Sequence, residues 1–375
     1  MVVVLLVIMV LACLTVFYRL WAPFGGIVRG ARGAVVHTSV HYGRKAFANL
    51  IATPMYFTLQ DAHTMLFEQL RGAPGRRPRQ DLVADKPDLQ TFASGSDTRF
   101  IWLGHSSFLL RMGGKNLLLD PVLSRRASPF QSIGPKRFSD PSLDVSELPD
   151  IDAVVISHDH YDHLDYGTVR QLRDKAKRFF VPLGVGAHLE RWGVRHDAIT
   201  ELDWWDTAEL DGLELVCAPA RHFSGRRLGD RNATLWGSWI IQTPQERLFF
   251  SGDTGYGPHF AEIGKRYGPF DVTLMECGQY DRRWANVHML PEQTVEAARE
   301  LGSKLFVPIH WGAFVLAFHA WTEPVERALK AASKQALPVV TPRLGQVVRL
   351  RDGAQKTAAW WTQAVETDHV PVGLR

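Results

Sequence analysis

One short stretch of the sequence concentrates side chains that bind metals. It reads Ser-His-Asp-His-Tyr-Asp-His over residues 157–163 and directly follows an apolar run, Ala153–Ile156. His158 and His160 are two positions apart, so an extended chain projects both imidazoles to the same side. Imidazole and carboxylate are ligands of zinc and similar cations, and burying such a cluster without a cation is costly. The stretch therefore predicts a metal site, with a solvated polar loop as the alternative.

Further ligands follow from one rule, that a His or Asp stands just beyond the end of an apolar strand. His222, Asp253 and His310 satisfy it. Strands of one sheet can deliver such residues to one rim, and the glycines around Asp253 permit the sharp turn and close backbone approach that a buried carboxylate ligand needs. The candidate metal ligands are therefore His158, His160, Asp162, His163, His222, Asp253 and His310.

The segments that must position these residues alternate short apolar runs with helical stretches. The strand candidates are Phe100–Leu103, Phe108–Met112, Asn116–Leu119, Ala153–Ile156, Arg178–Pro182, Leu213–Ala218, Trp236–Gln242, Arg247–Phe250, Val272–Met275, Leu305–Pro308 and Gln346–Leu350. The helix candidates are Tyr166–Lys177, His259–Tyr267, Pro291–Leu301 and Glu323–Ala332. Many strands with interspersed helices indicate a layered α/β or α+β domain.

Composition fits one large domain with extensions, since the chain has 375 residues, 46% hydrophobic and 22% charged. The net charge is +4, but the basic residues are scattered apart from Arg71, Arg76, Arg77 and Arg79. We interpret that cluster as a solvated linker rather than an anionic-lipid or nucleic-acid contact, and expect no nucleic-acid partner.

The three cysteines are far apart and imply no disulfide framework. Cys217 and Cys277 lie in or beside apolar runs, which favours buried small hydrophobes.

The N-terminus carries an uncharged apolar run, Val2–Tyr18. We interpret residues 1–26 as an uncleaved transmembrane anchor rather than a cleaved signal or a lipoprotein box. Because the nearby basic residues all follow the run, the positive-inside rule places the catalytic part on the cytoplasmic side. Residues 27–98 are expected to form a helical arm and a Pro/Gly/Arg-rich linker, the arm either packed on the main domain or lying on a membrane surface. Residues 99–352 then form the catalytic domain, and 353–375 a C-terminal tail.

The pattern His-x-His-x-Asp-His over residues 158–163, with His222, Asp253 and His310, resembles the metallo-β-lactamase superfamily. Over about residues 99–350 the chain is more narrowly similar to the N-acylphosphatidylethanolamine-hydrolysing phospholipases D and their bacterial relatives. The segments that carry this likeness are Trp102–Ser106, Leu119–Pro121, Gly134–Phe138, Glu201–Trp205, Leu235–Trp239, Gly252–Tyr256 and His310–Gly312.

The resemblance implies a four-layer αβ/βα sandwich and two metal ions. It assigns His158, His160 and His222 to one metal and Asp162, His163 and His310 to the other, with Asp253 as a bridging carboxylate. In the family, one residue neighbours an active-site histidine, and the resemblance aligns His288 with that neighbouring residue. The segment Met275–Tyr280 departs from the family pattern. We therefore expect two zinc ions or other divalent transition metals, with Asp162, Asp253 and His288 taking part in catalysis.

Three functions are compatible with these residues. The first is a phospholipase D-type phosphodiesterase that cleaves N-acylphosphatidylethanolamine-like lipids of a membrane with a metal-bridging hydroxide. There His288 would stabilise phosphate oxygens or protonate the leaving group. The second is a metal-dependent lactone or ester hydrolase, because the same nucleophile attacks carbonyl carbon. The third is a catalytically silent membrane-anchored binding protein.

Around the ligands, Asp120 is expected to orient a metal-bound imidazole. Asp159 either does the same or points to solvent. Lys136 and Arg137 either contact phosphate or form a structural loop, and no role for His105 follows from the sequence.

Overall fold

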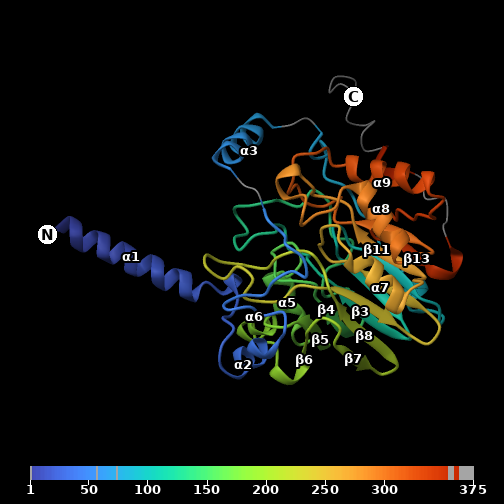
Figure 1. Cartoon of the computed structure of the whole chain (residues 1–375), viewed down its shortest axis with the longest axis horizontal. Coiled ribbons are helices and arrows are strands. Elements are labelled where there is room, and N and C mark those ends of the chain that lie inside the picture. The colour runs from blue at the N-terminus through green and yellow to red at the C-terminus, as the bar shows by residue number, and fades with distance from the viewer. Residues whose placement is uncertain (1, 56–57, 73–74, 354–358, 363–375) are drawn as a thin grey trace.

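In a computed structural model, residues 2–55, 58–72, 75–353 and 359–362 are described, and two β-sheets stacked face to face form the centre of the protein (Figure 1). The strands are β1 (Arg99–Trp102), β2 (Phe108–Met112), β3 (Lys115–Leu119), β4 (Ile151–Val155), β5 (Ala176–Pro182), β6 (Ile199–Leu202), β7 (Thr207–Leu210), β8 (Leu213–Ala218), β9 (Ser238–Gln242), β10 (Arg247–Phe250), β11 (Val272–Glu276), β12 (Phe306–Ile309) and β13 (Val347–Arg349). The α-helices are α1 (Val2–Leu20), α2 (Gly30–Thr38), α3 (Leu59–Arg71), α4 (Leu89–Ala93), α5 (Tyr166–Leu172), α6 (Gly186–Arg191), α7 (His259–Tyr267), α8 (Pro291–Glu300) and α9 (Glu323–Lys334).

Each sheet combines antiparallel and parallel pairs. The first has the order β13-β1-β2-β3-β4-β5-β6, and its strands run parallel from β3 to β6. The second has the order β12-β11-β10-β9-β8-β7, with β10, β11 and β12 parallel. Parallel neighbours end at the same edge of a sheet, so the loops that follow them converge there.

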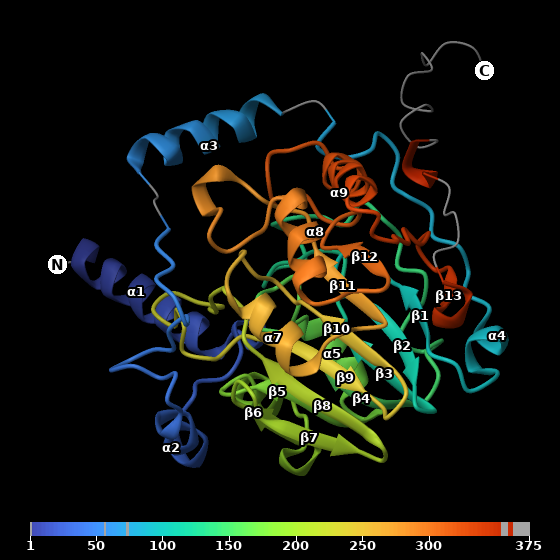
Figure 2. The ribbon, with the colours of Figure 1, turned by 45° about the vertical axis from the view of Figure 1, so that its right-hand side comes forward.

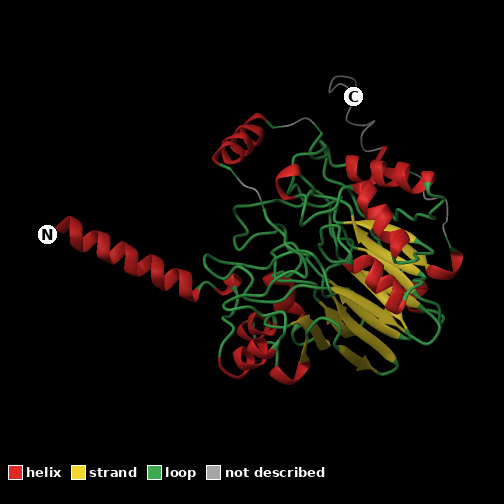
Figure 3. Ribbon diagram, viewed as in Figure 1, coloured by secondary structure: helices red, strands yellow, loops and turns green. Residues whose placement is uncertain are grey.

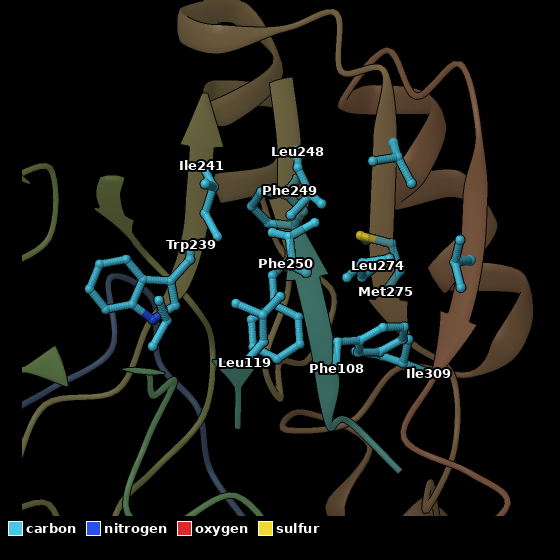
Figure 4. Packing of buried hydrophobic residues seen from close by; sticks show 14 of the residues in the cluster. Phe108, Leu119, Trp239, Ile241, Leu248, Phe249, Phe250, Leu274, Met275 and Ile309 are labelled. Carbon is cyan, nitrogen blue, oxygen red and sulfur yellow. The ribbon is translucent and has the colours of Figure 1, made fainter. Parts of the chain in front are cut away.

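Side-chain alternation divides the first sheet between two cores. In β1, Phe100 and Trp102 face the second sheet, whereas Ile101 packs with α5 and α6 on the other side. The core between the sheets is filled by large side chains such as Phe108 and Trp239, both fully buried (Figure 4). Burial of this apolar surface is the main force holding the two sheets together.

Helices cover both outer faces. Buried residues of α4, α5 and α6 pack on the first sheet, and α7, α8 and α9 lie over β10, β11 and β12 of the second (Figure 2). Residues 99–350 thus form the predicted mixed α/β sandwich, with helices outside, sheets inside and long loops gathered at one end of the strands (Figure 3).

The expected elements agree with the structure where hydrophobic periodicity was clear. The predicted bounds of β2, β8, β10 and α7 are those observed. The helix predicted over Tyr166–Lys177 ends at Leu172 because Ala176 already begins β5. The strands β6 and β7 were not predicted. Each lies at the edge of its sheet and contains polar residues, so neither forms a strong apolar run.

The predicted transmembrane anchor at residues 1–26 is wrong. Its apolar run forms α1, which has 19 residues and includes Arg19 near its end. Within the described ranges of the chain, the helices all lack the combination of length and apolar character that crossing a bilayer requires. A spanning helix needs about 20 consecutive, predominantly apolar residues. The cytoplasmic placement of the catalytic domain was inferred from this anchor and falls with it.

The end of α1 is held by the catalytic domain instead. Phe17 and Trp21 stack on Phe130, with ring centroids 6.3 and 5.5 Å away, and the Tyr18 hydroxyl donates to the carbonyl of Leu228 at 2.7 Å. These aromatic residues at the end of the apolar run therefore pack on the catalytic domain.

The arm and linker are only partly helical. Between α2 and α3, in the described residues 39–55, Asn49 exchanges hydrogen bonds of 2.8 and 3.0 Å with the backbone of His222. α3 begins with a capping box between Thr58 and Asp61. Of the predicted tail, residues 354–358 and 363–375 lie outside the described residues, whereas Trp360 and Trp361 are buried against Trp311.

Candidate metal centre

The predicted ligands meet in loops that follow the ends of strands. Long loops gather at one end of the sheets in Figure 3. Residues 158–163 occupy the loop between β4 and α5. His222 follows β8, Asp253 follows β10, and His310 follows β12. All the predicted ligands therefore lie beyond strand ends, as the sequence rule requires, and the structure brings every one of them into a single cluster.

A backbone link between the sheets closes the cluster. The loop after β1 pairs with the loop after β12, because His310 N donates to His105 O at 3.1 Å and His105 N donates to Trp311 O at 3.2 Å. His105 and His310 both adopt positive φ, 54° and 67°, which is uncommon for residues other than glycine. Backbone strain of this kind collects at functional sites.

The first ligand group contains His158, His160, His222 and Asp253, whose ligand atoms all lie within 4.8 Å of one another. Nδ1 of His160 is 2.9 Å from Nε2 of His158 and 3.2 Å from Nε2 of His222. Zinc–nitrogen bonds of about 2.0–2.1 Å in a tetrahedron place the nitrogens roughly 3.3 Å apart. The spacing of these three nitrogens therefore fits one tetrahedral cation.

The second group contains His105, Asp162, His163 and His310, again with ligand atoms within 4.8 Å. Oδ2 of Asp162 is 2.9 Å from Nε2 of His105 and 3.4 Å from Nε2 of His163. His105 was not predicted as part of the site. The strand-end rule finds it when applied to the apolar run Phe100–Leu103, after which His105 is the next histidine.

Asp253 lies between the two groups. Its Oδ2 is 3.1 Å from Nε2 of His163 and 3.8 Å from Nε2 of both His158 and His222. Its Oδ1 is 3.1 Å from Nδ1 of His310. Asp253 therefore lies within reach of both groups: Oδ2 lies between His163 and the first group, and Oδ1 faces His310.

Several buried atoms of the cluster lack hydrogen bonds. Within the described residues, Nε2 of His163, Nε2 of His310 and Oδ1 of Asp253 have no hydrogen-bond partner. Unpartnered buried polar atoms are rare and costly in folded proteins. A divalent cation among them satisfies all three, so the imidazole and carboxylate donors present here fit a divalent metal ion.

Electrostatics favour the metal-binding forms of the histidines. Burial lowers the pKa of His158, His222 and His310 well below 6.5, and the neighbouring histidines lower it further. Neutral imidazole is the form that donates a lone pair to a metal.

The carboxylates and His163 form a tightly coupled group. Burial raises the pKa of Asp253 to about 6, against the opposing effect of His163. Burial also acts to raise the pKa of Asp162, but His163 and the hydrogen bond from His105 outweigh it and hold that pKa well below 3.8. Burial lowers the pKa of His163, but Asp253, Asp162 and Asp120 outweigh it and raise that pKa well above 6.5.

Asp120 forms a hydrogen bond with the ring of the predicted ligand His163, the contact expected of a residue that orients an imidazole. Its Oδ2 accepts from Nδ1 of His163 at 2.7 Å, and its Oδ1 accepts from the backbone N–H of Ser157 at 2.7 Å. With Nδ1 of His163 engaged, Nε2 is the nitrogen that faces the other ligands. Carboxylates in this arrangement fix the tautomer of a ligating histidine.

Asp159 is buried and does not point to solvent. Its carboxylate accepts from Gly225 N at 2.8 Å and from the Thr234 hydroxyl at 2.9 Å, and it lies 3.3 Å from Nε2 of His188. It holds two loops together rather than orienting one of the predicted ligands. His188, which the sequence treats as ordinary, is buried beside it.

His288 lies next to the metal cluster, and its Nδ1 is 3.2 Å from Oε2 of Glu276. Glu276 ends β11, is fully buried, and accepts from Met289 N at 2.7 Å through Oε1. Burial raises the pKa of Glu276 well above 4.5 and lowers that of His288. Glu276 occupies the segment where the sequence departs from the family pattern, and it leaves Nε2 of His288 for the pocket.

A pocket of about 330 Å³ opens above the cluster. Its polar lining includes His160, Asp162, Asp253, His288 and His310. Its remaining lining is His222 and Gln279 together with a mostly apolar wall: Met55, Phe223, Trp284, Val287, Leu316 and Arg283. The pocket thus joins a metal-binding floor to a mostly apolar wall. Arg283 in this wall and Glu276 behind His288 have no local sequence signal, because the residues beside them in the chain do not reveal what they contact in the fold.

Lys136 and Arg137 do not line this pocket. Arg137 is buried and donates to the carbonyl oxygens of Leu103 and Val122, so it has the structural role. Cys217 and Cys277 are buried free thiols, as the sequence predicts.

Residues 115–311 match the family model of the beta-lactamase superfamily domain. The chain belongs to this superfamily, which with the two-sheet fold and the ligand clusters places it among the superfamily's metal-dependent hydrolases.

Relatives place it within that superfamily. An uncharacterized protein of Mycobacterium tuberculosis is 45% identical over 334 residues, covering 88% of this chain and 89% of that protein. The N-acyl-phosphatidylethanolamine-hydrolyzing phospholipase D 1 of Caenorhabditis elegans is 35% identical over 249 residues, covering 63% of this chain and 68% of that enzyme. A solved metallo hydrolase of Ignicoccus hospitalis shares the fold, with a TM-score of 0.53, 22% identity, and coverage of 68% of this chain and 98% of that chain.

Proposed function

We propose that this protein is a binuclear, zinc-dependent phosphodiesterase of phospholipase D type that cleaves N-acylphosphatidylethanolamine-like lipids. The observation that carries the proposal is the pair of ligand groups with Asp253 between them, on the floor of a pocket with an apolar wall. The similarity to the nematode phospholipase D supports the choice of substrate class.

We assign His158, His160 and His222 to one metal ion, and Asp162, His163 and His310 to the other, with Asp253 shared. Nitrogen and carboxylate donors of this kind suit zinc, and other divalent transition metals accept them as well. When bound, two such cations activate water as a nucleophile and neutralise charge that develops on phosphate oxygens.

The protein residues supply the rest of the reaction. Asp120 holds the His163 ring through Nδ1 and so directs Nε2 at the metal position. Glu276 holds Nδ1 of His288 and so presents Nε2 to the pocket, where it donates a proton to the leaving oxygen or a hydrogen bond to a phosphate oxygen. The apolar wall excludes water and accommodates the acyl chains.

The test is a screen of the purified, metal-loaded protein against N-acylphosphatidylethanolamine, phosphatidylethanolamine and lactone substrates. We expect water to add to phosphorus as the P–O bond to the ethanolamine oxygen breaks, which releases N-acylethanolamine and phosphatidic acid. Turnover of lactones or esters alone would replace this proposal with the carbonyl-hydrolase alternative. A protein that binds metal but cleaves none of these substrates would leave the binding-protein alternative.

Two substitutions link activity to the cluster. His160→Ala and Asp253→Ala each remove a ligand, so we expect metal content below that of wild type and loss of nearly all turnover. Lys304→Gln serves as a control, because Lys304 lies on the surface and pairs only with Asp271 at 2.8 Å among the described contacts. Wild-type turnover in either ligand variant would refute the assignment.

A further inference from the structure

Arg283 combines a buried position with unused hydrogen-bond donors. It belongs to the short 3-10 helix η3 (Arg282–Trp284), lines the pocket above the metal cluster, and is only 7% exposed. Its Nε donates to Asp281 at 2.6 Å, and its Nη2 donates to Asp281 and, at 3.0 Å, to Glu68 of α3. Its Nη1 is buried and finds no partner anywhere in the described chain.

The guanidinium is also held rigidly in place. Its carbon lies 4.5 Å from the ring centroid of Phe318 and 5.5 Å from that of Trp284. Two carboxylates and two rings therefore fix its plane, so the Nη1 hydrogens have a fixed direction. Arg283 lines the pocket, so this buried and rigidly held donor without a partner is a recognition element for a ligand oxygen that reaches it from the pocket.

The charges around Arg283 indicate which oxygen this is. Asp281 and Glu68 both contact this guanidinium and already neutralise its positive charge. Arg76, which lies on the same Phe318 ring, balances the second carboxylate, and Arg282 is largely exposed and 3.9 Å from Asp61. An anion therefore finds no net positive charge here, whereas a neutral acceptor needs none.

We propose that Nη1 of Arg283 donates to a neutral carbonyl oxygen, of an amide or ester, in the acyl part of the substrate. This inference rests on the proposed function and names the substrate feature that the pocket recognises. The apolar residues Met55, Phe223 and Leu316 of the same wall then contact the acyl chain beyond that carbonyl. Arg283 is a specificity-determining residue in this assignment.

The test measures binding of product-like probes to the metal-loaded, full-length protein. Isothermal titration in neutral detergent compares N-palmitoylethanolamine, which has an amide carbonyl, with 2-hexadecyloxyethanol, which has none, and with palmitate, which has a carboxylate in place of the amide. A hydrogen bond from a charged donor corresponds to about tenfold or more in affinity, so we expect wild type to favour the amide over the ether by that factor.

The decisive variant is Arg283→Lys, which keeps the cation but loses the planar donor, and it should reduce the amide preference to about threefold or less. Arg76→Lys is the matched control, because Arg76 lies 4.6 Å from the same Phe318 ring but does not line this pocket. Equal binding of amide and ether by wild type, or an unchanged preference in Arg283→Lys, would overturn the inference.

A second variant protects the test if Arg283→Lys does not fold. Glu68→Gln removes one carboxylate from the partly exposed face of α3 and is expected to improve palmitate binding relative to N-palmitoylethanolamine. An unchanged ratio would overturn the charge argument. Because these readouts measure binding, amide selectivity without any phosphodiester cleavage would refute the proposed function alone.

Discussion

Asp120→Asn tests how the fold prepares His163 for metal. Asp120 is fully buried and accepts hydrogen bonds from Ser157 N and from Nδ1 of His163, both at 2.7 Å. Its φ is 37°, a backbone conformation that asparagine also tolerates, so the substitution keeps the turn. The amide oxygen can still accept from Ser157 N, but the amide NH₂ now faces His163.

The consequence follows from the chemistry of imidazole. An NH₂ donor requires Nδ1 of His163 to accept, which moves the ring proton to Nε2, the atom directed at the other ligands. A protonated Nε2 cannot ligate a metal. Loss of such an outer carboxylate typically weakens metal binding about 10- to 100-fold, equivalent to roughly 1.4–2.7 kcal/mol. The folding cost of the weakened hydrogen bonds is smaller, about 1–2 kcal/mol.

Competition with a chelator, read by elemental analysis, measures the metal affinity, and urea unfolding of the metal-free protein measures stability. The matched control is Asp165→Asn, which changes another buried aspartate that caps α5 by accepting from the N–H groups of Gly167 and Thr168. Asparagine is also a good N-cap, so this control should leave metal affinity unchanged. If Asp120→Asn retained two metals with wild-type affinity, the tautomer argument would be wrong.

Three further predictions test neighbouring features. Glu276→Gln should retain both metals but lower kcat by about tenfold or more, because it alters the partner of His288 Nδ1. Steady-state kinetics together with metal analysis measure this effect. An unchanged kcat would make Glu276 a structural residue only. Burial lowers the pKa of His259 from 6.5 to about 3, so the unfolded chain binds more protons between these values and stability is lost as pH falls through that window. Between pH 7 and pH 5, the free energy of unfolding should fall by about 1 kcal/mol more per pH unit in wild type than in His259→Gln. Urea unfolding of both proteins at the two pH values measures this difference. An equal fall in the two proteins would contradict the prediction. Gly278→Ala should destabilise by about 1–3 kcal/mol and reduce metal content, because a Cβ at Gly278 would lie 2.0 Å from the His310 carbonyl oxygen; wild-type unfolding and metal content would show that the backbone relaxes freely.

The sequence by itself predicted much of the catalytic domain. Alternating and continuous apolar runs located β2, β8 and β10, because buried strands must carry apolar side chains toward a core. The ligand positions followed from residue type and place, since parallel strands deliver the residues beyond their ends to one edge. His222 and His310 are 88 positions apart in the numbering, yet the rule found both.

Other features depended on contacts that no local pattern contains. Hydropathy alone predicted a membrane anchor from the apolar run at the N-terminus. Only the structure shows that the end of this run packs Phe17 and Trp21 on Phe130. His105 entered the cluster through a backbone pairing with Trp311, more than 200 residues away in the numbering.

The chemical character of the site was decided at the same level. By residue type, Glu276 and Arg283 are ordinary charged residues. Burial and its partners give Glu276 a role in orienting His288, and they leave Arg283 with hydrogen-bond donors that have no partner among the described residues. A side chain acquires its pKa, tautomer and free hydrogen-bonding capacity from the groups folded around it. The sequence thus determined which chemistry was available, and the tertiary structure decided which atoms face the pocket.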